Sequence, residues 1–306
     1  MNAPTDRRIF LGGSNAAAVL GVGAFGETPL SVYLEKTAAT PAPLDPEQEK
    51  FFRRRKRQEP VVRDMIQEDW DIDVIAMNQR YNDFEYPFLS AEIDFEWLDT
   101  TGRIQNGEIK TVHPFALMRG SETWGEDGSD EVPIHYFTQS MHGLMVTGRE
   151  RCLFAVLVGV DQLLRYEVRR DDETIAGMRE KLVAFWRNHI EPRVPPPPQT
   201  FDDLKALYPR SATNSIEATP KIIEEWKKLR ELDGQLKAFA DERAIAEFHV
   251  KEFMRDAQAL TVSGHPIATW RSSRTERFQQ ESFKKDHPEL FRQYVKPSEG
   301  RTFRIK

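Results

Sequence analysis

"PFLSAEIDFEWLDTTGRIQNGEIKTV", residues 87–112, decides the fold class of this chain. On each side of "DTTG", residues 99–102, apolar and aromatic side chains are interleaved with polar ones. Such alternation is typical of β-strands, and a short segment ending in Gly between two such runs is typical of a hairpin turn. The stretch therefore predicts two neighbouring strands of one sheet.

An acidic residue and a lysine stand two positions apart on the second of these strands. Glu108 and Lys110 point to the same face, because side chains two residues apart in a strand share a face. The hairpin brings Asp94, on the first strand, close to Glu108. Two neighbouring carboxylates repel unless a cation lies between them, and Mg²⁺ and Mn²⁺ prefer oxygen ligands. The pattern predicts a divalent-metal site here.

Lys110 has two interpretations. Beside a metal-bound phosphate it would hold or deprotonate a water molecule, or neutralise charge that develops on the phosphate. Alternatively, Glu108 and Lys110 form an ordinary ion pair on the surface of the sheet, since Glu-x-Lys is a loose pattern. The spacing alone leaves both interpretations open.

Side chains from predicted helices bear on that choice. Glu59 lies on a preceding helix and would add a third carboxylate. Gln139 and His142 lie one turn apart on the following helix, shortly after Tyr136. The alternatives are a solvent-facing Gln139 and a His142 that is a core histidine with its hydrogen bonds satisfied.

The rest of the chain up to residue 190 alternates between helical and strand-like segments. Two short helices are expected within 9–37, followed by a helix over 47–70 that Pro60 kinks or restarts. Further strands are expected at 73–79, 151–160 and 163–171, and further helices at 133–148 and 172–190. This order predicts an α/β (α+β) fold with a mixed sheet flanked by helices.

A proline run divides the sequence. "PRVPPPPQ", residues 192–199, is stiff and extended, so we expect a core over 1–194, a Pro-rich linker over 195–216 and a helical extension over 217–306. In the extension, apolar residues recur at three- and four-residue steps between 217 and 260. The pattern fits either a coiled-coil-like helix or a helical hairpin bent near Gly234.

The charge of the chain is uneven. The net charge is −6, yet residues 271–306 hold ten Lys or Arg and five Asp or Glu, so this end is +5 and the remainder −11. A uniformly basic nucleic-acid coat is excluded, whereas a local basic surface is not. The tail is therefore either a solvated surface or a contact for an anionic partner. The basic cluster "RRRKR", residues 53–57, has the same two interpretations.

The single cysteine and the N-terminus bear on location. Cys152 lies in an apolar strand-like run, so it is expected to be buried and inert, and no disulfide is possible within the chain. "DRRIFLGGSNAAAVLGVGAF", residues 6–25, has the outline of a twin-arginine export signal. Ser14 and Asn15 interrupt its apolar run, however, and a short capped helix explains it better. We expect a reducing, cytoplasmic location in a bacterial host and no membrane span.

Taken together, several of these motifs resemble the YqaJ-type viral recombinase family, which is related to bacteriophage lambda exonuclease within the PD-(D/E)xK nuclease superfamily. The resemblance extends over about residues 8–190. It is carried by "FLGGSNAAAVLGVGAFGETPLSVYLEKT", "RQEPVV", "YPFLSAEIDF", "NGEIKT" and "PIHYFTQSMHGLMVTG", and the tail "DHPELFRQYVKPSEGRTFRIK" resembles the endings of longer members.

The resemblance implies roles for individual residues. Asp94, Glu108 and Lys110 match the superfamily's catalytic motif, Glu59 its helix-borne glutamate, and Gln139 the glutamine that helps place the attacking water. The backbone carbonyl of Ile109 would be a further metal ligand. The residues implied for binding a 5′-phosphate and DNA are Ser14, at a helix start, one of Arg7 and Arg8, and Arg119.

Two departures from the family pattern concern the phosphate pocket. In the family, the aspartate that matches Asp94 is the last residue of a Ser-Pro-Asp pattern. This chain has Glu92-Ile93-Asp94 instead. Glu92 would repel a phosphate or attract a cation. Arg119 is near the expected position of the family's second arginine but does not match it. Dependence on a 5′-phosphate is therefore open.

The resemblance implies a Mg²⁺-dependent exonuclease for double-stranded DNA, with Mn²⁺ as a substitute, that resects ends from 5′ to 3′ in phage-type recombination. It also implies a homotrimer and a partner single-strand annealing protein. The alternatives are an endonuclease of the same fold and a non-catalytic DNA-binding scaffold.

Overall fold

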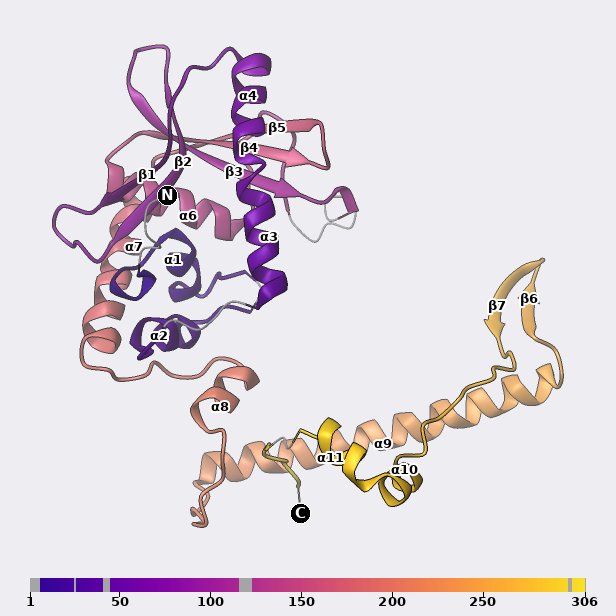
Figure 1. Ribbon diagram of the computed structural model, residues 1–306. Helices are drawn as coiled ribbons and strands as arrows, with labels where there is room; N and C mark the ends of the chain where they lie inside the picture. Colours follow the sequence, from indigo (N-terminus) through magenta and orange to yellow (C-terminus); the bar gives the residue numbers. More distant parts are fainter. Residues whose placement is uncertain (1–5, 25, 41–44, 116–122, 297–298, 306) are drawn as a thin grey trace. The chain divides into compact units, whose positions relative to one another are not determined.

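The computed structural model describes residues 6–24, 26–40, 45–115, 123–296 and 299–305. The chain divides into two units, Met1–Leu207 and Tyr208–Lys306, which are described separately (Figure 1).

The first unit begins with short helices. After a 3₁₀ turn (Arg7–Ile9), α1 (Gly13–Val19) and α2 (Pro29–Thr37) confirm the two helices expected before residue 38. Thr28 caps α2 by accepting a hydrogen bond from the Ser31 amide, and Pro29 occupies its first turn. The small apolar run of the N-terminus is built into the core, since the alanines of α1 are buried.

A pair of consecutive helices follows. α3 (Pro46–Lys56) and α4 (Glu59–Trp70) are separate helices, with Pro60 in the first turn of α4. The break predicted at this proline is confirmed. It has a physical cause, because proline has no amide hydrogen to donate inside a helix but is tolerated in the first turn.

The centre of the first unit is one sheet of five strands. They are β1 (Val74–Asn82), β2 (Ser90–Leu98), β3 (Ile104–Val112), β4 (Arg151–Val158) and β5 (Gln162–Arg169), in spatial order β1-β2-β3-β4-β5. β3 and β4 are parallel, and the other neighbouring pairs are antiparallel. The parallel pair requires a crossover, which contains α6 (Ile134–Thr147). The predicted mixed sheet is confirmed.

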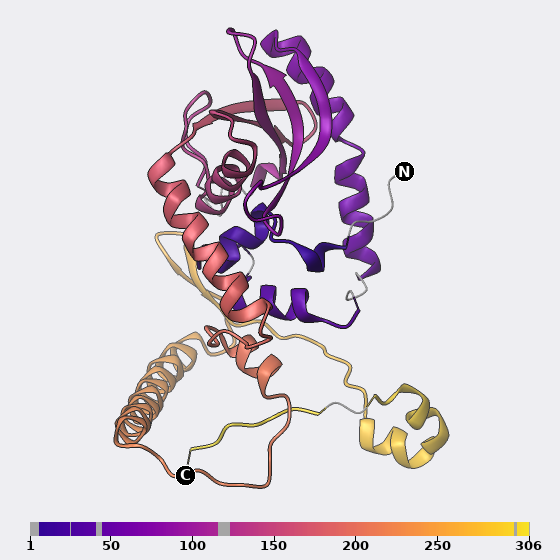
Figure 2. The same cartoon turned by 90° about the vertical axis from the view of Figure 1, so that its left-hand side faces the viewer.

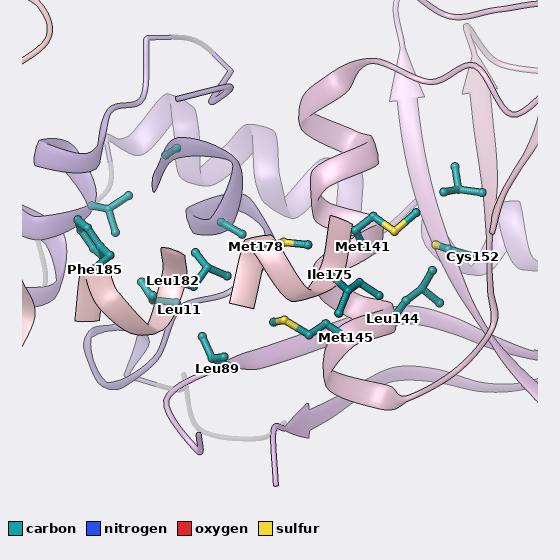
Figure 3. Packing of buried hydrophobic residues seen from close by; sticks show 14 of the residues in the cluster. Leu11, Leu89, Met141, Leu144, Met145, Cys152, Ile175, Met178, Leu182 and Phe185 are labelled. Atoms are coloured by element: carbon teal, nitrogen blue, oxygen red, sulfur yellow. The ribbon is translucent and has the colours of Figure 1, made fainter. Parts of the chain in front are cut away.

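Helices cover both faces of this sheet (Figure 2). One face packs against α1, α2, α6 and α7 (Asp172–Phe185), which continues into a π-helical turn (Trp186–Ile190). Figure 3 shows part of this cluster, where Met141 and Leu144 of α6 lie beside Ile175 and Met178 of α7. The other face packs Phe95 and Trp97 against α4. Cys152 is buried, as predicted.

The stretch expected to be a linker contains a short helix that belongs to the first unit. α8 (Phe201–Leu207) is held by Asp203, whose carboxylate accepts hydrogen bonds from the Thr28 hydroxyl at 2.7 Å and from the Gln199 amide at 2.8 Å. Thr28 and Asp203 are both buried. The first unit therefore extends to Leu207, beyond the proline run.

The second unit is built around α9 (Pro220–Met254), a single helix of 35 residues. The alternative of a hairpin bent near Gly234 is wrong, because the helix runs through this glycine without interruption. A two-stranded sheet, β6 (Ala259–Val262) with β7 (His265–Thr269), and two short helices, α10 (Gln280–Asp286) and α11 (Pro288–Tyr294), complete it. Among the described residues, no helix is both long and apolar enough to cross a membrane.

Candidate active site

The predicted carboxylates meet where β2 and β3 separate. The antiparallel ladder between these strands runs from Leu98–Ile104 to Phe95–Gly107. Continued by one residue, it places Asp94 opposite Glu108. There the Ile109 amide donates to the Asp94 carboxylate, at 2.9 Å, instead of to a backbone carbonyl. We call this place, where Asp94 and Glu108 face each other, the strand fork.

The ladder fits together closely at the fork because residue 107 is glycine. A Cβ on Gly107 would overlap the ring of Phe95, which is fully buried. β3 meanwhile stays paired with β4 as far as Val112. The β3 strand of the fork, which carries Glu108, is therefore held rigidly by its pairing with β4.

Lys110 and Gln139 both contact Glu108. The Lys110 ammonium lies 2.8 Å from Oε2 of Glu108, and the Gln139 amide donates to the same oxygen at 2.8 Å. Lys110 also donates to Oε1 of Gln139 at 3.2 Å. Glu108 is only 3% exposed, so this is no surface ion pair. The structure brings together Asp94, Glu108, Lys110 and Gln139.

Two local features position the side chains of Gln139, on α6, and Lys110, on β3. A Cβ on Gly13 would lie 2.7 Å from the Gln139 side chain, so glycine at the start of α1 leaves room for Gln139. The Lys110 ammonium lies 5.0 Å from the centre of the Tyr136 ring, where the π-electrons favour a cation. Both contacts restrict where Gln139 and Lys110 can point.

Burial and charge set the protonation of the pair. Burial raises the pKa of Glu108 above its ordinary value; Lys110 offsets part of the rise, and repulsion from Asp94 adds to it. For Lys110, burial lowers the pKa, but Glu108 and Asp94 outweigh burial and raise it overall. Lys110 is therefore an ammonium at neutral pH, which makes it a hydrogen-bond donor and a positive charge rather than a base.

Glu59 lies at the start of α4, near the fork but in a different set of contacts. Lys56 is 3.1 Å from its carboxylate, and the Asn78 amide donates to it at 3.3 Å. Burial raises the pKa of Glu59, and the nearby charge of Asp94 contributes in the same direction. The charge of Asp94 therefore acts on Glu59, whose carboxylate is held in place by Lys56 and Asn78.

Asn78 is a residue that sequence reasoning missed. Its backbone is left-handed, with φ of 54°, and its side chain links Lys56 to Glu59. Asn tolerates this conformation better than most residues. The β1–β2 register places it opposite Asp94. An asparagine inside a predicted strand was the only available signal, because both partners are about 20 positions away.

A cavity of about 400 Å³ adjoins the fork. Asp94 and Gln139 line it together with Arg7 and Ser14, and Arg7 donates to the Ser14 hydroxyl at 3.4 Å. Arg8 does not line it: its guanidinium binds Asp6 and the Ala38 and Ala39 carbonyls. Arg119 lies outside the described residues. Of the two N-terminal arginines, Arg7 is therefore the one that lines this cavity.

Glu92 is paired inside this cavity with a residue that the sequence analysis did not single out. Arg80 of β1 lies opposite Glu92 in the ladder, and their side chains are 2.9 Å apart. The Arg80 guanidinium also stacks over Phe10, 4.9 Å from the ring centre. Arg7 in turn lies 4.0 Å from Glu35. Both cavity arginines are thus close to carboxylates of the chain itself.

A buried polar network supports the fork from behind. Glu96 and Asn106 form the next pair but one in the β2–β3 ladder, and both are buried. Arg149 reaches Glu96 at 2.7 Å and Asn106 at 2.9 Å, while the Tyr81 hydroxyl donates to Glu96 at 2.6 Å. Satisfied networks of this kind rigidify their surroundings.

His142 has no contact with the fork. It is fully buried, and within the described residues neither ring nitrogen has a hydrogen-bond partner. Burial lowers its pKa to about 4, so the ring is neutral. The core position of His142 is therefore confirmed, but the hydrogen bonds expected of a satisfied core histidine are not found among the described residues.

The donor set of the fork fits a hard divalent cation. Within the part of the chain that the structure describes, no three Asp, Glu, His or Cys side chains form a metal-binding group. Two carboxylates remain, the half-buried Asp94 and the buried Glu108. The Ile109 carbonyl faces the same side as its amide, because a strand residue directs both groups toward one neighbour. Mg²⁺ is commonly held by one or two carboxylates plus water and substrate oxygens.

Comparisons with known proteins found relatives by sequence and by structure. Residues 5–150 match the model of the YqaJ-like viral recombinase domain. The uncharacterised protein YqaJ of Bacillus subtilis is 24% identical over 98% of this chain and 92% of its own length. An alkaline exonuclease from Laribacter hongkongensis is a more distant structural match, with 17% identity and a TM-score of 0.43 over 60% of this chain and 88% of its own. Its complex with dAMP gives 18% identity and a TM-score of 0.44. The matched segment, residues 5–150, includes both strands of the fork, so the part of the chain that holds the fork is similar to the YqaJ-like viral recombinase domain.

Proposed function

We propose that this protein is a metal-dependent exonuclease that resects the ends of double-stranded DNA, from 5′ to 3′, for recombination by single-strand annealing. The observation that carries the proposal is the strand fork, where two carboxylates, a protonated lysine and a glutamine converge. The family match and the alkaline exonuclease among the structural matches are consistent with it.

Each residue of the fork has a role in this proposal. Asp94, Glu108 and the Ile109 carbonyl would hold Mg²⁺, or Mn²⁺ in its place, and Glu59 would contribute to a second ion. A bound ion supplies positive charge that polarises the scissile phosphate. Lys110 and Gln139 orient the attacking water, and Lys110 also stabilises the negative charge that grows on the phosphate.

DNA-end recognition is assigned to the adjoining cavity. Arg7 and Ser14 are the groups that would contact a terminal phosphate, because they line the cavity beside Asp94. Arg119 stays a proposal from the sequence alone. The exposed basic residues of α3 would contact the DNA backbone. A homotrimer and a partner annealing protein are likewise proposed from the resemblance.

An endonuclease of the same fold is the second candidate, and one observation favours it. Glu92 pairs with Arg80, and Glu35 lies near Arg7, so neither cavity arginine is surrounded by positive charge alone. Such a cavity would bind a terminal phosphate dianion less tightly than one in which the arginines had no carboxylate beside them. An enzyme without that demand would also accept an uninterrupted strand.

The test uses end-labelled linear duplex and closed circular duplex, each with Mg²⁺. We expect the linear duplex to be degraded from its 5′ ends and the circle to be spared. Lys110→Ala should bind DNA but cut at least about 1000-fold more slowly, since it removes the positive charge that lies beside Glu108 in the site. Lys205→Ala, which removes an exposed lysine of α8, is the matched control and should cut normally.

Three outcomes would overturn parts of the proposal. Cutting of the circle at a comparable rate would replace the exonuclease by the second candidate. Normal cutting by Lys110→Ala would remove the proposed mechanism. If the unaltered protein cuts neither substrate with Mg²⁺ or Mn²⁺, the proposed nuclease activity is wrong and the alternative of a non-catalytic DNA-binding scaffold is favoured.

A further inference from the structure

One line of residues on α9 repeats with the period of a coiled coil. Alternating steps of three and four residues define what we call the α9 seam: Ile222, Glu225, Leu229, Leu232, Leu236, Phe239, Arg243, Ala246, Val250 and Phe253. Eight of these ten positions are apolar. Apolar side chains every 3.5 residues on average are the signature of helices that wind around one another.

Nine of the ten seam residues are exposed and Leu229 is half-buried; β6 and β7 adjoin the seam at its end, around a cavity that Val250 and Phe253 line. Leu236 is 66% exposed and Phe239 65%, and of the α9 residues only Met254 is buried. The helix is also unusually long, spanning roughly 50 Å at 1.5 Å per residue. A contiguous apolar seam of this length is normally covered by a partner.

The two charged seam residues indicate which partner fits. In a parallel pair of α9 helices, Glu225 would face Glu225 of the second copy and Arg243 would face Arg243, inside the apolar seam. In the antiparallel pair that sets Leu232 against Leu236 of the second copy, Glu225 instead faces Arg243. Because such a pair is two-fold symmetric, this ion pair forms twice.

Charges beside the seam favour the same alignment. Lys228 flanks the seam on one side and meets Glu242 of the second copy, again twice. Asp233 meets its own counterpart at the two-fold axis, but at the exposed edge, where water screens like charges. Among the described residues of the single chain, the one ion pair of Arg243 is with Glu247 of its own helix, at 3.3 Å, and Arg243 is exposed, so it is available for the second copy.

We propose that α9 pairs with the α9 of a second copy of this chain as an antiparallel, two-stranded coiled coil, with two Glu225–Arg243 ion pairs inside the seam. Because three copies cannot all pair two by two, the second copy belongs to another trimer wherever the proposed homotrimer forms. A cavity of about 370 Å³ lies beside Ala246, with Val250 and Trp270 on its walls. The alignment sets Ile222 of the second copy against Ala246, at the edge of this cavity. A bulky residue thus meets a small one where there is space.

Charge exchange tests the pairing in the full-length protein, with self-association measured by sedimentation velocity. Arg243→Glu and Glu225→Arg should each weaken self-association about tenfold or more, because each places two like charges against each other in the seam. An equimolar mixture of the two variants should restore it, since every Glu then faces an Arg. Both variants should keep the nuclease rate on a short duplex. Unchanged association in both variants, or no recovery in the mixture, overturns the proposal.

The direction of pairing is tested with one spin label. The only native thiol, Cys152, is buried, so Lys221→Cys can be labelled selectively. In the antiparallel pair the two labels lie 26 residues apart along the axis, about 40 Å. Leu236→Lys in the labelled protein should abolish this distance while circular dichroism stays helical. A distance below about 20 Å, or no dipolar signal from the labelled protein alone, overturns the proposal, and the latter points to a different protein as partner.

Discussion

Phenylalanine side chains are buried in the first unit and exposed in the second unit. Phe95 and Phe154, on the central sheet, are completely buried, whereas Phe239 and Phe253 of α9 are more than half exposed. The first unit therefore obtains its apolar burial within one chain, around a sheet covered on both faces. The second unit has a long helix but little to cover it. The difference teaches that only the first unit is folded around a core of its own.

The largest expected effect is at Gly107, where the first unit has no spare room. Gly107→Ala forces a Cβ into the buried ring of Phe95 and should lower the free energy of unfolding of the first unit by about 3 kcal/mol. Denaturant unfolding followed by circular dichroism measures this. Adding Phe95→Leu should recover part of the loss. An unaltered midpoint would contradict the tight packing described for the fork.

His142 offers a pH-dependent test of burial in the first unit. The folded-state pKa of His142 is lowered to about 4 from an ordinary value near 6.5, so the unfolded chain binds this proton first on acidification. The contribution to stability is complete above pH 6.5 and is lost between pH 6.5 and 4, by about 3 kcal/mol. His142→Leu should be at least as stable at pH 7 and should lose less stability at pH 5. Parallel stability–pH curves for the two proteins would contradict the assignment.

Asn78 allows a further test of the first unit, because its side chain links Lys56 to Glu59 near the fork. Asn78→Gly keeps the left-handed backbone but removes the link to Glu59, and should weaken Mn²⁺ binding about tenfold in calorimetry. Asn214→Gly, at an exposed position in the second unit, is the matched control and should bind Mn²⁺ normally. Equal affinities in the two variants would show that Asn78 does not position Glu59.

The smallest expected effect has the opposite sign and concerns Gly234. A Cβ there would meet nothing within 4 Å, so Gly234→Ala should stabilise α9 by about 1 kcal/mol, the usual gain in helix propensity. Helicity measured at 222 nm during thermal unfolding reports it. A loss of helicity would mean that α9 bends at this glycine in solution, which would break the contrast with Gly107.

Local signals predicted the fork well. The hairpin around residues 99–102 placed Asp94 beside Glu108, and strand alternation placed Lys110 on the same face as Glu108, because both depend only on residues close in sequence. The helix around Gln139 was also predicted from the sequence, but the pattern left a solvent-facing Gln139 open, and only the family resemblance assigned this residue to the site. These predictions were possible because the chemistry of the fork is carried by regular secondary structure.

Contacts between distant segments could not be predicted in this way. The contacts of Asn78 require a left-handed residue inside a strand, and the pairing of Glu92 with Arg80 requires the register of β1. Asp203 contacts Thr28 across 175 positions of sequence, so nothing near the proline run signalled that α8 belongs to the first unit. For Gly234, one glycine fits equally a bend and a tolerated interruption of helix propensity.

The strand fork has a thermodynamic consequence. A divalent cation held between Asp94 and Glu108 would fasten two strands at the point where their ladder ends, and it would bind only the folded chain. By mass action, each tenfold rise in free cation above its dissociation constant would add about 1.4 kcal/mol to the stability of the first unit. The second unit would gain nothing. Supply of the ion would then govern the lifetime of the enzyme as well as its chemistry.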